Sequence, residues 1–221
     1  MEKNKILFEK SEANKWFRRN RKFINKSNIS SSITTLSKWL KPFEKKISNI
    51  LEIGCGTGHN LNQLSKKLKA NGFGIDPSSE AVNFMTKKFP KLKVKVGSGD
   101  KVPFLKKFDL VHLGFFLYLV DRKDYLKCVS EADRLLNSGG FLSIIDFDTP
   151  FPYSNSYSHL KGVFSHKKNN SEVFVSSGLY SLVSKFQYSQ KNFFFNKNID
   201  ERISISLLYK ETKIFRVNKK K

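Results

Sequence analysis

A glycine-rich segment at residues 52–58 reads E-I-G-C-G-T-G, the composition of a nucleotide-binding turn. Glycine lacks a Cβ, so a ligand can approach the backbone closely where such a turn joins a buried strand to a helix. Asp76 ends the next apolar segment, where its carboxylate can accept hydrogen bonds from both ribose hydroxyls of an adenosine. These residues predict a cofactor that contains adenosine and leave its class open.

Two features disfavour NAD as that cofactor. The dinucleotide-binding pattern G-x-G-x-x-G is incomplete, because His59 stands where its third glycine would be. Glu52 ends an apolar segment, and burying a carboxylate there is costly unless a cation partners it. A dehydrogenase cofactor offers no such cation at this position, so an NAD-dependent oxidoreductase is the weaker interpretation.

Residues 50–58, which read I-L-E-I-G-C-G-T-G, resemble the first motif of class I S-adenosylmethionine-dependent methyltransferases. The resemblance continues in order and spacing through residues 74–78, 97–99, 108–111 and 135–140, and it covers about half of the chain. It implies an enzyme that uses S-adenosyl-L-methionine, similar to a bacterial group that methylates small molecules, including surface sugars.

The resemblance also implies roles for individual residues. Glu52 would hold the methionine end of the cofactor, which carries an amino group and a sulfonium, and Asp76 would hold the ribose. Ser98 stands where many relatives place Asp to bind the adenine amino group, so the adenine contact is expected to be shared by Ser98, Gly99 and Asp100.

An N-terminal segment, W-F-R-R-N at residues 16–20, is similar to an F-x-R-N segment found ahead of this domain in a group of bacterial methyltransferases. The similarity implies a helix that closes over the cofactor, whereas an ordinary amphipathic helix anchored by Trp16 is an equally good interpretation. The predicted cofactor-binding residues are Trp16, Arg19, Glu52, Gly54, Cys55, Gly56, Gly58, Asp76, Pro77, Ser98, Gly99 and Asp100.

The candidate catalytic residues are histidines. Methyl transfer from a sulfonium is an in-line displacement, so a base is needed only where the acceptor is a hydroxyl or a carbon acid. His159 and His166 lie in a segment expected to cover the site, and His112 lies in a predicted buried strand. His112 is equally well interpreted as a hydrogen-bonded core histidine. Further polar candidates at the ends of the fourth and fifth predicted strands are Tyr118, Asp146 and Asp148.

The acceptor is predicted less directly than the cofactor. Residues 112–116 read H-L-G-F-F in place of an Asn/Asp-Pro-Pro-aromatic motif, which disfavours methylation of exocyclic amino groups of bases. Residues 157–167 loosely resemble lids of methyltransferases from surface-sugar pathways, so a sugar or nucleotide-sugar is the expected acceptor. Lysine in this segment could bind phosphate.

Two alternatives of other classes stay open. The net charge of +22, with arginines at positions 18, 19 and 21, is compatible with an RNA methyltransferase, although the scattered lysine excess is better explained as a compositional habit of the source proteome. A protein that binds the cofactor without catalysis is the other alternative, because no single catalytic residue stands out.

The chemistry-bearing residues lie in a β-α alternation from residue 47 to residue 147, which is typical of a parallel sheet covered by helices on both faces. The expected fold is a single Rossmann-like, doubly wound α/β sheet, mostly parallel with an antiparallel last strand. Strand five is expected at residues 141–147, after a turn at 137–140, and two half-exposed antiparallel strands are expected at 179–189 and 202–210.

The expected domain organisation is an N-terminal helical cap at residues 1–46 and a methyltransferase domain at 47–215. A lid insertion is expected at 149–177, where neither strand nor helix periodicity persists, and a basic tail at 216–221, with 218–221 disordered.

Composition points to a cytoplasmic protein. No apolar stretch is long enough for a spanning helix, and the charged N-terminus lacks a signal core. The two cysteines, Cys55 and Cys128, form neither a disulfide framework nor a metal-ligand spacing, so no metal is expected. The sequence does not indicate an oligomeric state.

Overall fold

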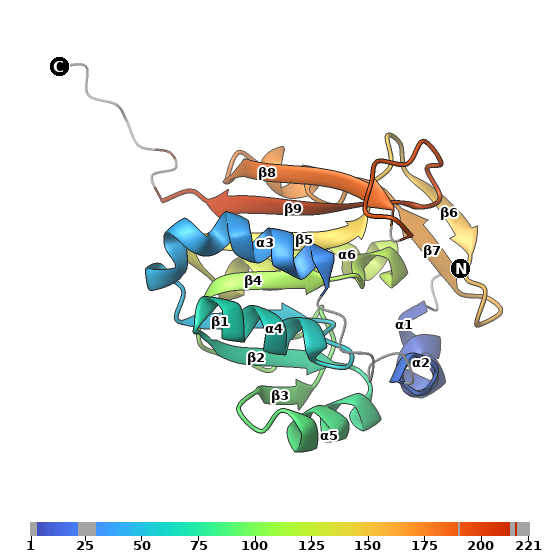
Figure 1. The fold of residues 1–221 in the computed structure, drawn as a ribbon. Helices are drawn as coiled ribbons and strands as arrows, with labels where there is room; N and C mark the ends of the chain where they lie inside the picture. The colour runs from blue at the N-terminus through green and yellow to red at the C-terminus, as the bar shows by residue number, and fades with distance from the viewer. Residues whose placement is uncertain (1–3, 22–29, 190, 213–214, 216–221) are drawn as a thin grey trace.

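Seven strands form one sheet in the order β3-β2-β1-β4-β5-β9-β8 (Figure 1). The computed structural model describes residues 4–21, 30–189, 191–212 and 215. Strands β1 to β5 pair in parallel, and β9 runs antiparallel to both β5 and β8. The strands are β1 (Asn49–Ile53), β2 (Asn71–Asp76), β3 (Lys93–Val96), β4 (Phe108–Gly114), β5 (Leu136–Phe147), β8 (Tyr180–Ser189) and β9 (Arg202–Lys210). The structure confirms the predicted fold class.

Helices cover both faces of the sheet, as the β-α alternation predicts (Figure 1). Leucines at helical spacing in α3 and α4 pack on one face with Ile50, Leu110 and Leu207, and α6 packs on the other with Val111 and Leu142. The main helices are α3 (Ser31–Leu40), α4 (His59–Leu68), α5 (Ser79–Lys88) and α6 (Arg122–Leu135), with 3₁₀ turns η3 (Lys41–Lys46) and η4 (Leu117–Leu119). The core therefore has two apolar layers with the sheet between them.

The N-terminal cap consists of consecutive short helices beside the C-terminal ends of the parallel strands (Figure 1). They are α1 (Asn4–Leu7), a π-helical turn η1 (Phe8–Glu12) and α2 (Ala13–Asn20). The buried Phe17 of α2 packs with Ala81, Val82 and Met85 of α5. The cap is thus packed against the sheet domain through α2, whereas α3 packs separately on one face of the sheet.

Strand five begins earlier than predicted. The segment 136–140 continues the strand after α6 instead of forming a free turn, because the fully buried Leu136 pairs with Phe108 and the side-chain amide of Asn137 donates to Asp109 over 2.8 Å. A register shift between Phe108 and Leu110 accommodates the extra residues as an irregularity.

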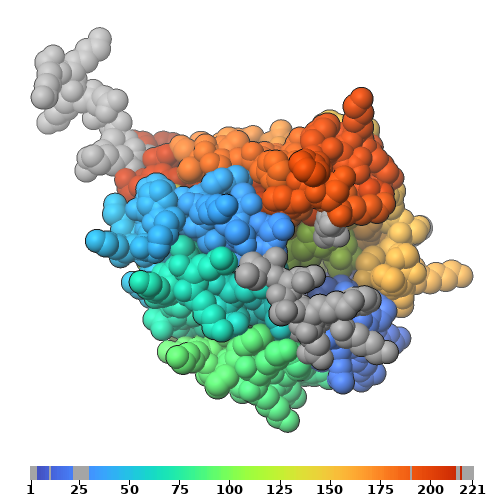
Figure 2. All heavy atoms as spheres, viewed as in Figure 1, coloured from blue at the N-terminus to red at the C-terminus, as the bar shows by residue number. Residues whose placement is uncertain are grey.

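The predicted C-terminal pair of strands is confirmed, but its exposure is not. Strand β9 is buried on both faces between β5 and β8, so that only the edge strand β8 is half-exposed. At the surface drawn in Figure 2, α3 lies directly beside the β8–β9 segment. Alternation in β9 therefore reflects two covered faces and not one.

The insertion at 149–177 is more regular than predicted. It contains an antiparallel hairpin, β6 (Tyr153–Ser156) and β7 (Phe164–Lys167), followed by the one-turn helix α7 (Glu172–Val175). The expected basic tail, 216–221, lies outside the described residues. Within the described part of the chain, no helix combines the length and apolarity that a bilayer crossing requires.

Candidate active site

A cavity of about 350 Å³ opens where strands β1, β2 and β4 end, next to the point at which strand order reverses. Ten predicted cofactor residues line it: Trp16, Glu52, Gly54, Cys55, Gly56, Asp76, Pro77, Ser98, Gly99 and Asp100. Two others, Gly58 and Arg19, do not. The N-terminal cap contributes Lys5, Phe8, Glu9 and Ala13, none of which the sequence pattern marked.

The glycine turn is tied to the end of β2. The backbone N–H groups of Gly54 and Cys55 both donate to the carbonyl of Ile75 over 3.0 Å. Gly54 and Gly56 have φ values of 77° and 50°, a left-handed region that favours glycine. A Cβ on Gly56 would lie 3.1 Å from the ring of Trp16, so the turn also allows the cap to approach closely.

Gly58 serves packing and does not face the cavity. It is the left-handed residue at the start of α4, with a φ of 73°. A Cβ there would lie 2.6 Å from the sulfur of the buried Met85 in α5. The glycine therefore lets α4 and α5 pack closely.

The carboxylate of Asp76 is bound to the glycine turn by a backbone hydrogen bond. Its Oδ2 accepts the N–H of Gly56 over 2.8 Å, and its Oδ1 accepts the N–H of Ser78 over 2.9 Å. Burial raises the pKa of Asp76 to about 6, against the effect of the two N–H donors, which favour the carboxylate. Each oxygen keeps a lone pair for a further donor at the cavity wall.

Glu52 is the most costly side chain in the cavity. It is only 2% exposed, and its Oε2 has no hydrogen-bond partner among the described residues. Burial and the nearby carboxylate of Asp76 raise the pKa of Glu52 well above its ordinary value. A buried acid with one unpartnered oxygen, at the wall of a cavity, fits a cationic ligand.

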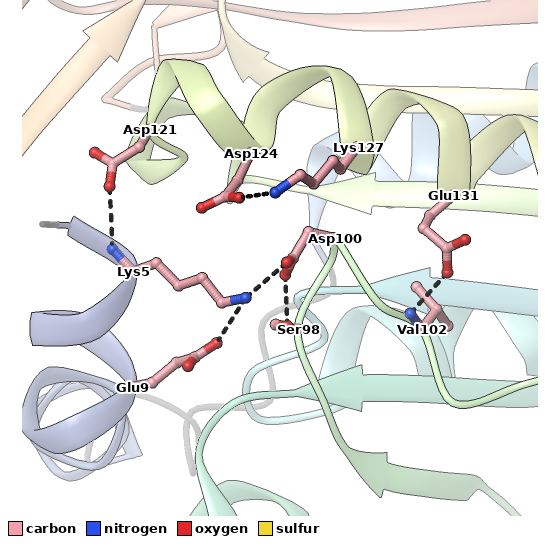
Figure 3. Close-up of polar contacts among 9 residues, drawn as sticks. All are labelled: Lys5, Glu9, Ser98, Asp100, Val102, Asp121, Asp124, Lys127 and Glu131. Atoms are coloured by element: carbon pink, nitrogen blue, oxygen red, sulfur yellow. Dashed lines mark hydrogen bonds and ion pairs between the residues drawn. The ribbon is translucent and has the colours of Figure 1, made fainter. Parts of the chain in front are cut away.

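The loop after β3 is held by the cap (Figure 3). Asp100 accepts the hydroxyl of Ser98 over 2.6 Å and the ammonium of Lys5 over 2.6 Å. Burial alone would raise the pKa of Asp100, but these two donors lower it below its ordinary value. The predicted adenine-binding loop is thus connected directly to α1.

Arg19 forms its contacts within the cap and does not line the cavity. Its guanidinium pairs with Glu12, a fully buried acid of η1 that also accepts the hydroxyl of Tyr157 over 3.3 Å. Arg18 pairs with Glu80 at the start of α5. The predicted closing helix is present, and its two arginines join it to α5 and to the insertion.

The structure separates the three candidate histidines. His159 is exposed beside Tyr157, and His166 is bonded to Ser154 over 2.7 Å; neither lines the cavity. His112 is only 1% exposed, with Nδ1 2.7 Å from the Ser143 hydroxyl and Nε2 3.9 Å from Glu52. Burial lowers the pKa of His112 to about 4.

The other polar candidates are also fixed in the fold. Asp146 accepts N–H groups of Tyr118 and Phe147, and burial raises its pKa to about 7. Asp148 is buried and pairs with Lys185 over 2.9 Å. Tyr118 lines the cavity next to Phe115, a residue with a φ of 55° that sequence patterns did not single out.

Comparisons with known proteins agree with this geometry. Residues 50–140 match the family described as a methyltransferase domain. The chain is 29% identical over 110 residues to a ubiquinone/menaquinone biosynthesis C-methyltransferase, UbiE, of Campylobacter jejuni, with 47% of this chain and 46% of the relative covered. It is 26% identical over 182 residues to a demethylmenaquinone methyltransferase of Chlorobaculum parvum, covering 74% and 73%. The chain spans about half the length of the first curated relatives it matches.

Solved structures share the fold at low identity. A Burkholderia thailandensis 1,6-didemethyltoxoflavin-N1-methyltransferase superposes with a TM-score of 0.65 at 12% identity, covering 89% of this chain and 84% of the other. The N-methyltransferase NodS of Bradyrhizobium japonicum gives 0.61 at 15% identity, covering 90% and 98%. The amino pentose methyltransferase CalS10 of Micromonospora echinaspora gives 0.64 at 9% identity, covering 87% and 96%.

The fold, the cavity and the matched domain define a Rossmann-like protein built for an adenosine-containing, cationic cofactor. Residues 50–140 form a methyltransferase domain, and the fold is that of the class I S-adenosylmethionine-dependent methyltransferases, whose cofactor is S-adenosyl-L-methionine. The resemblance seen in the sequence is thereby confirmed.

Proposed function

We propose that this protein transfers the methyl group of S-adenosylmethionine to a small-molecule acceptor. The observation that carries the proposal is the buried carboxylate of Glu52 at the wall of the cavity, whose Oε2 has no hydrogen-bond partner among the described residues. S-adenosylmethionine supplies an electrophilic methyl on sulfur and an ammonium group that would satisfy this carboxylate. Asp76 would accept the ribose hydroxyls, and the loop 98–100 would border the adenine.

The cap supports a small acceptor. Phe8 and Trp16 of the cap line the cavity, where their rings would help to exclude water from a reaction that depends on orientation more than on acid–base chemistry. The relatives named above act, by their names, on ubiquinone or menaquinone precursors, on didemethyltoxoflavin or on an amino pentose. The sugar or nucleotide-sugar acceptor expected from residues 157–167 remains one specific version of this proposal.

RNA is the less favoured acceptor. Arg18 and Arg19, which contribute to the basic N-terminal segment, are engaged with Glu80 and Glu12, so neither guanidinium is free to clamp phosphate. Binding to bulk RNA that weakens steeply with salt would favour RNA instead. We also place the protein in the cytoplasm, a proposal that the two free, buried cysteines support.

Calorimetric titration with S-adenosylmethionine and S-adenosylhomocysteine, on the wild type and on Asp76→Ala, tests the proposal. We expect micromolar binding to the wild type and a loss of at least tenfold in the variant, because one charge-assisted site for two hydroxyls is removed. Absence of binding by folded wild-type protein would rule out the proposed function. Retained binding without turnover of any acceptor would favour the non-catalytic alternative.

A further inference from the structure

A second cavity, of about 530 Å³, adjoins the first at the carboxyl ends of the strands, on the face covered by α3 and α4. The two cavities share the wall residues Asn60, Gly114 and Phe115. Phe115 has a left-handed backbone conformation, and its N–H donates a hydrogen bond to the carbonyl of Ile145 over 2.8 Å. Its ring packs on Tyr118 and Phe147. A strained residue at the junction of two cavities is typical of functional sites.

Three polar side chains in register connect the cavities. Glu52 of β1 pairs with His112 of β4, and His112 pairs with Ser143 of β5, so all three point to the same face of the sheet. Glu52 lines the first cavity and His112 lines the second. Their facing atoms, Oε1 and Nε2, are 3.9 Å apart.

The second nitrogen of His112 lacks a hydrogen-bond partner in the described part of the chain. In the neutral tautomer in which Nδ1–H donates to the Ser143 hydroxyl, Nε2 carries the lone pair. Nε2 is buried and has no hydrogen-bond partner among the described residues. An orphaned acceptor at a cavity wall indicates that a donor belonging to a ligand binds there.

The lining of the second cavity indicates the kind of ligand. The rings of Phe115, Tyr188 and Phe193 and the side chain of Ile145 provide one apolar wall, and the rings of Tyr188 and Phe193 lie 4.5 Å apart. The rest of the lining is polar apart from Gly114 and carries one positive charge: Ser30, Ser31, Ser32, Asn60, His112, Lys191 and Asn192. No carboxylate is among the described residues that line this cavity, whereas six carboxylates line the first: Glu9, Glu52, Asp76, Asp100, Asp121 and Asp124. The second cavity therefore suits a planar ring that becomes negatively charged, and the first suits a cation.

We propose that the second cavity binds the methyl acceptor, a planar ring compound with a phenol-type hydroxyl, and that Nε2 of His112 accepts the hydroxyl proton. This inference rests on the proposed function and assigns the acceptor site for it. The hydroxyl O–H bond breaks as its proton moves to Nε2, and the oxygen forms a bond to the methyl carbon. The carbon–sulfur bond breaks with its electron pair left on sulfur, which becomes the neutral thioether of S-adenosylhomocysteine.

Glu52 would support this proton transfer from the other side. Burial lowers the pKa of His112 to about 4, so the imidazolium needs a nearby negative charge. Once an ammonium in the first cavity favours the ionised form of Glu52, its carboxylate lies 3.9 Å from Nε2 and opposes this effect of burial. Acceptor deprotonation is thereby expected to depend on an occupied cofactor cavity, which protects the acceptor proton until the methyl donor is present.

The test uses 4-nitrophenol as the probe, because its phenolate absorbs visibly and no methyl transfer is needed. The probe is titrated into protein saturated with S-adenosylhomocysteine, at a pH where the free phenol is mostly protonated. We expect binding with growth of the phenolate band, a weakening of about tenfold or more in His112→Gln, and loss of that band in the variant. His159→Gln, whose side chain lies outside both cavities, provides the matched histidine change.

A second variant covers the case in which His112→Gln does not fold. Phe193→Ala, in the loop after β8, removes an aromatic wall that packs on the edge strand β8 and leaves the parallel strands unchanged, and we expect weaker probe binding with unchanged affinity for S-adenosylhomocysteine. Equal probe binding in both variants and the wild type would overturn the inference.

Three further outcomes would also overturn it. His112→Gln could lose affinity for S-adenosylhomocysteine as strongly as Glu52→Gln does, which would place His112 in the cofactor site. UDP-glucose could bind the loaded protein where 4-nitrophenol does not, which would favour the sugar acceptor. If the wild type binds no S-adenosylhomocysteine at all, the proposed function fails, and the assigned acceptor site fails with it.

Discussion

The ammonium of Lys5 lies 2.6 Å from the carboxylate of Asp100 and so joins the first helix to the loop after β3 (Figure 3). The N–H of Lys5 also faces Asp121, and its ammonium lies 4.0 Å from Glu9. The hydrogen bond that Lys5 donates to Asp100 raises the pKa of Lys5, so the pair stays ionised near neutral pH. Lys5 thus connects the cap to Asp100 and Asp121 at the edge of the first cavity.

Replacing Lys5 should loosen the cap. For Lys5→Ala we expect severalfold faster dissociation of S-adenosylhomocysteine, because the cap loses its contact with the loop 98–100. Stopped-flow displacement of a fluorescent analogue would measure the rate. Lys41→Ala, which removes an ion pair of similar length with Glu44 within η3, is the matched control, and an equal effect of both changes would contradict the assignment.

Glu52→Gln should stabilise the ligand-free protein and weaken its binding of S-adenosylhomocysteine. In the ligand-free protein the variant avoids burying an ionisable group with an unpartnered oxygen. We therefore expect its free energy of unfolding to be higher by about 1–3 kcal/mol. Affinity for S-adenosylhomocysteine should fall at least tenfold, since the cationic amino group loses its carboxylate. Urea denaturation and calorimetry on the same preparation would measure both, and Glu44→Gln should change neither. A destabilised Glu52→Gln that binds normally would refute this account.

Asp76 should make the ligand-free protein less stable as pH rises. Its folded-state pKa of about 6 lies above the ordinary value of 3.8, so between these values the folded chain binds more protons than the unfolded chain. The contribution falls by about 1.4 kcal/mol per pH unit across this window and is constant above it. Comparing urea denaturation of the wild type and Asp76→Asn from about pH 4 to about pH 7 would isolate this contribution, which should be missing in the variant.

Cofactor binding should show the opposite dependence on Asp76. Ribose hydroxyls donate to the carboxylate, so affinity for S-adenosylhomocysteine should weaken as pH falls below about 6, by at most about tenfold per unit. Titrations above and below this pH would measure the change. An Asp76→Asn variant with the same pH dependence as the wild type would assign the effect to another group.

Two glycines with the same backbone conformation separate strain from packing. Gly58 and Gly178 have φ values of 73° and 72°, but a Cβ on Gly178 would meet nothing within 4 Å, whereas one on Gly58 would meet Met85. We expect Gly178→Ala to cost about 1 kcal/mol from backbone strain, and Gly58→Ala to cost about 1–3 kcal/mol more because of the clash. Equal losses in urea denaturation would show that Met85 moves away freely.

Much of the fold followed from local patterns. The glycine turn, the alternating apolar strands and the leucine spacing of α4 predicted the parallel half of the sheet, because each depends on residues close in sequence. Strand five and the burial of β9 could not be predicted in the same way. They depend on pairing of Leu136 with Phe108 and of β9 with β5, contacts between segments far apart in the chain.

Most of the predicted cofactor residues line the first cavity, whereas the second cavity was not predicted. Glu52 and Asp76 carried their signal in residue type and position at strand ends, where the topology of a parallel sheet collects side chains at one edge. Lys5 and Phe115 had no such signal, since nothing in a lysine-rich N-terminus or an aromatic run says which residue will meet a cavity.

The sequence by itself determined the class of fold, the glycine turn and the acids beside it, because short-range periodicity and glycine spacing encode them. Only the tertiary structure decided which histidine faces a cavity. His112 is brought beside Glu52 and Ser143 by strand register, whereas His159 and His166 lie outside both cavities. Register is fixed by the burial of whole strand faces in a common core, and that is a property of the assembled sheet.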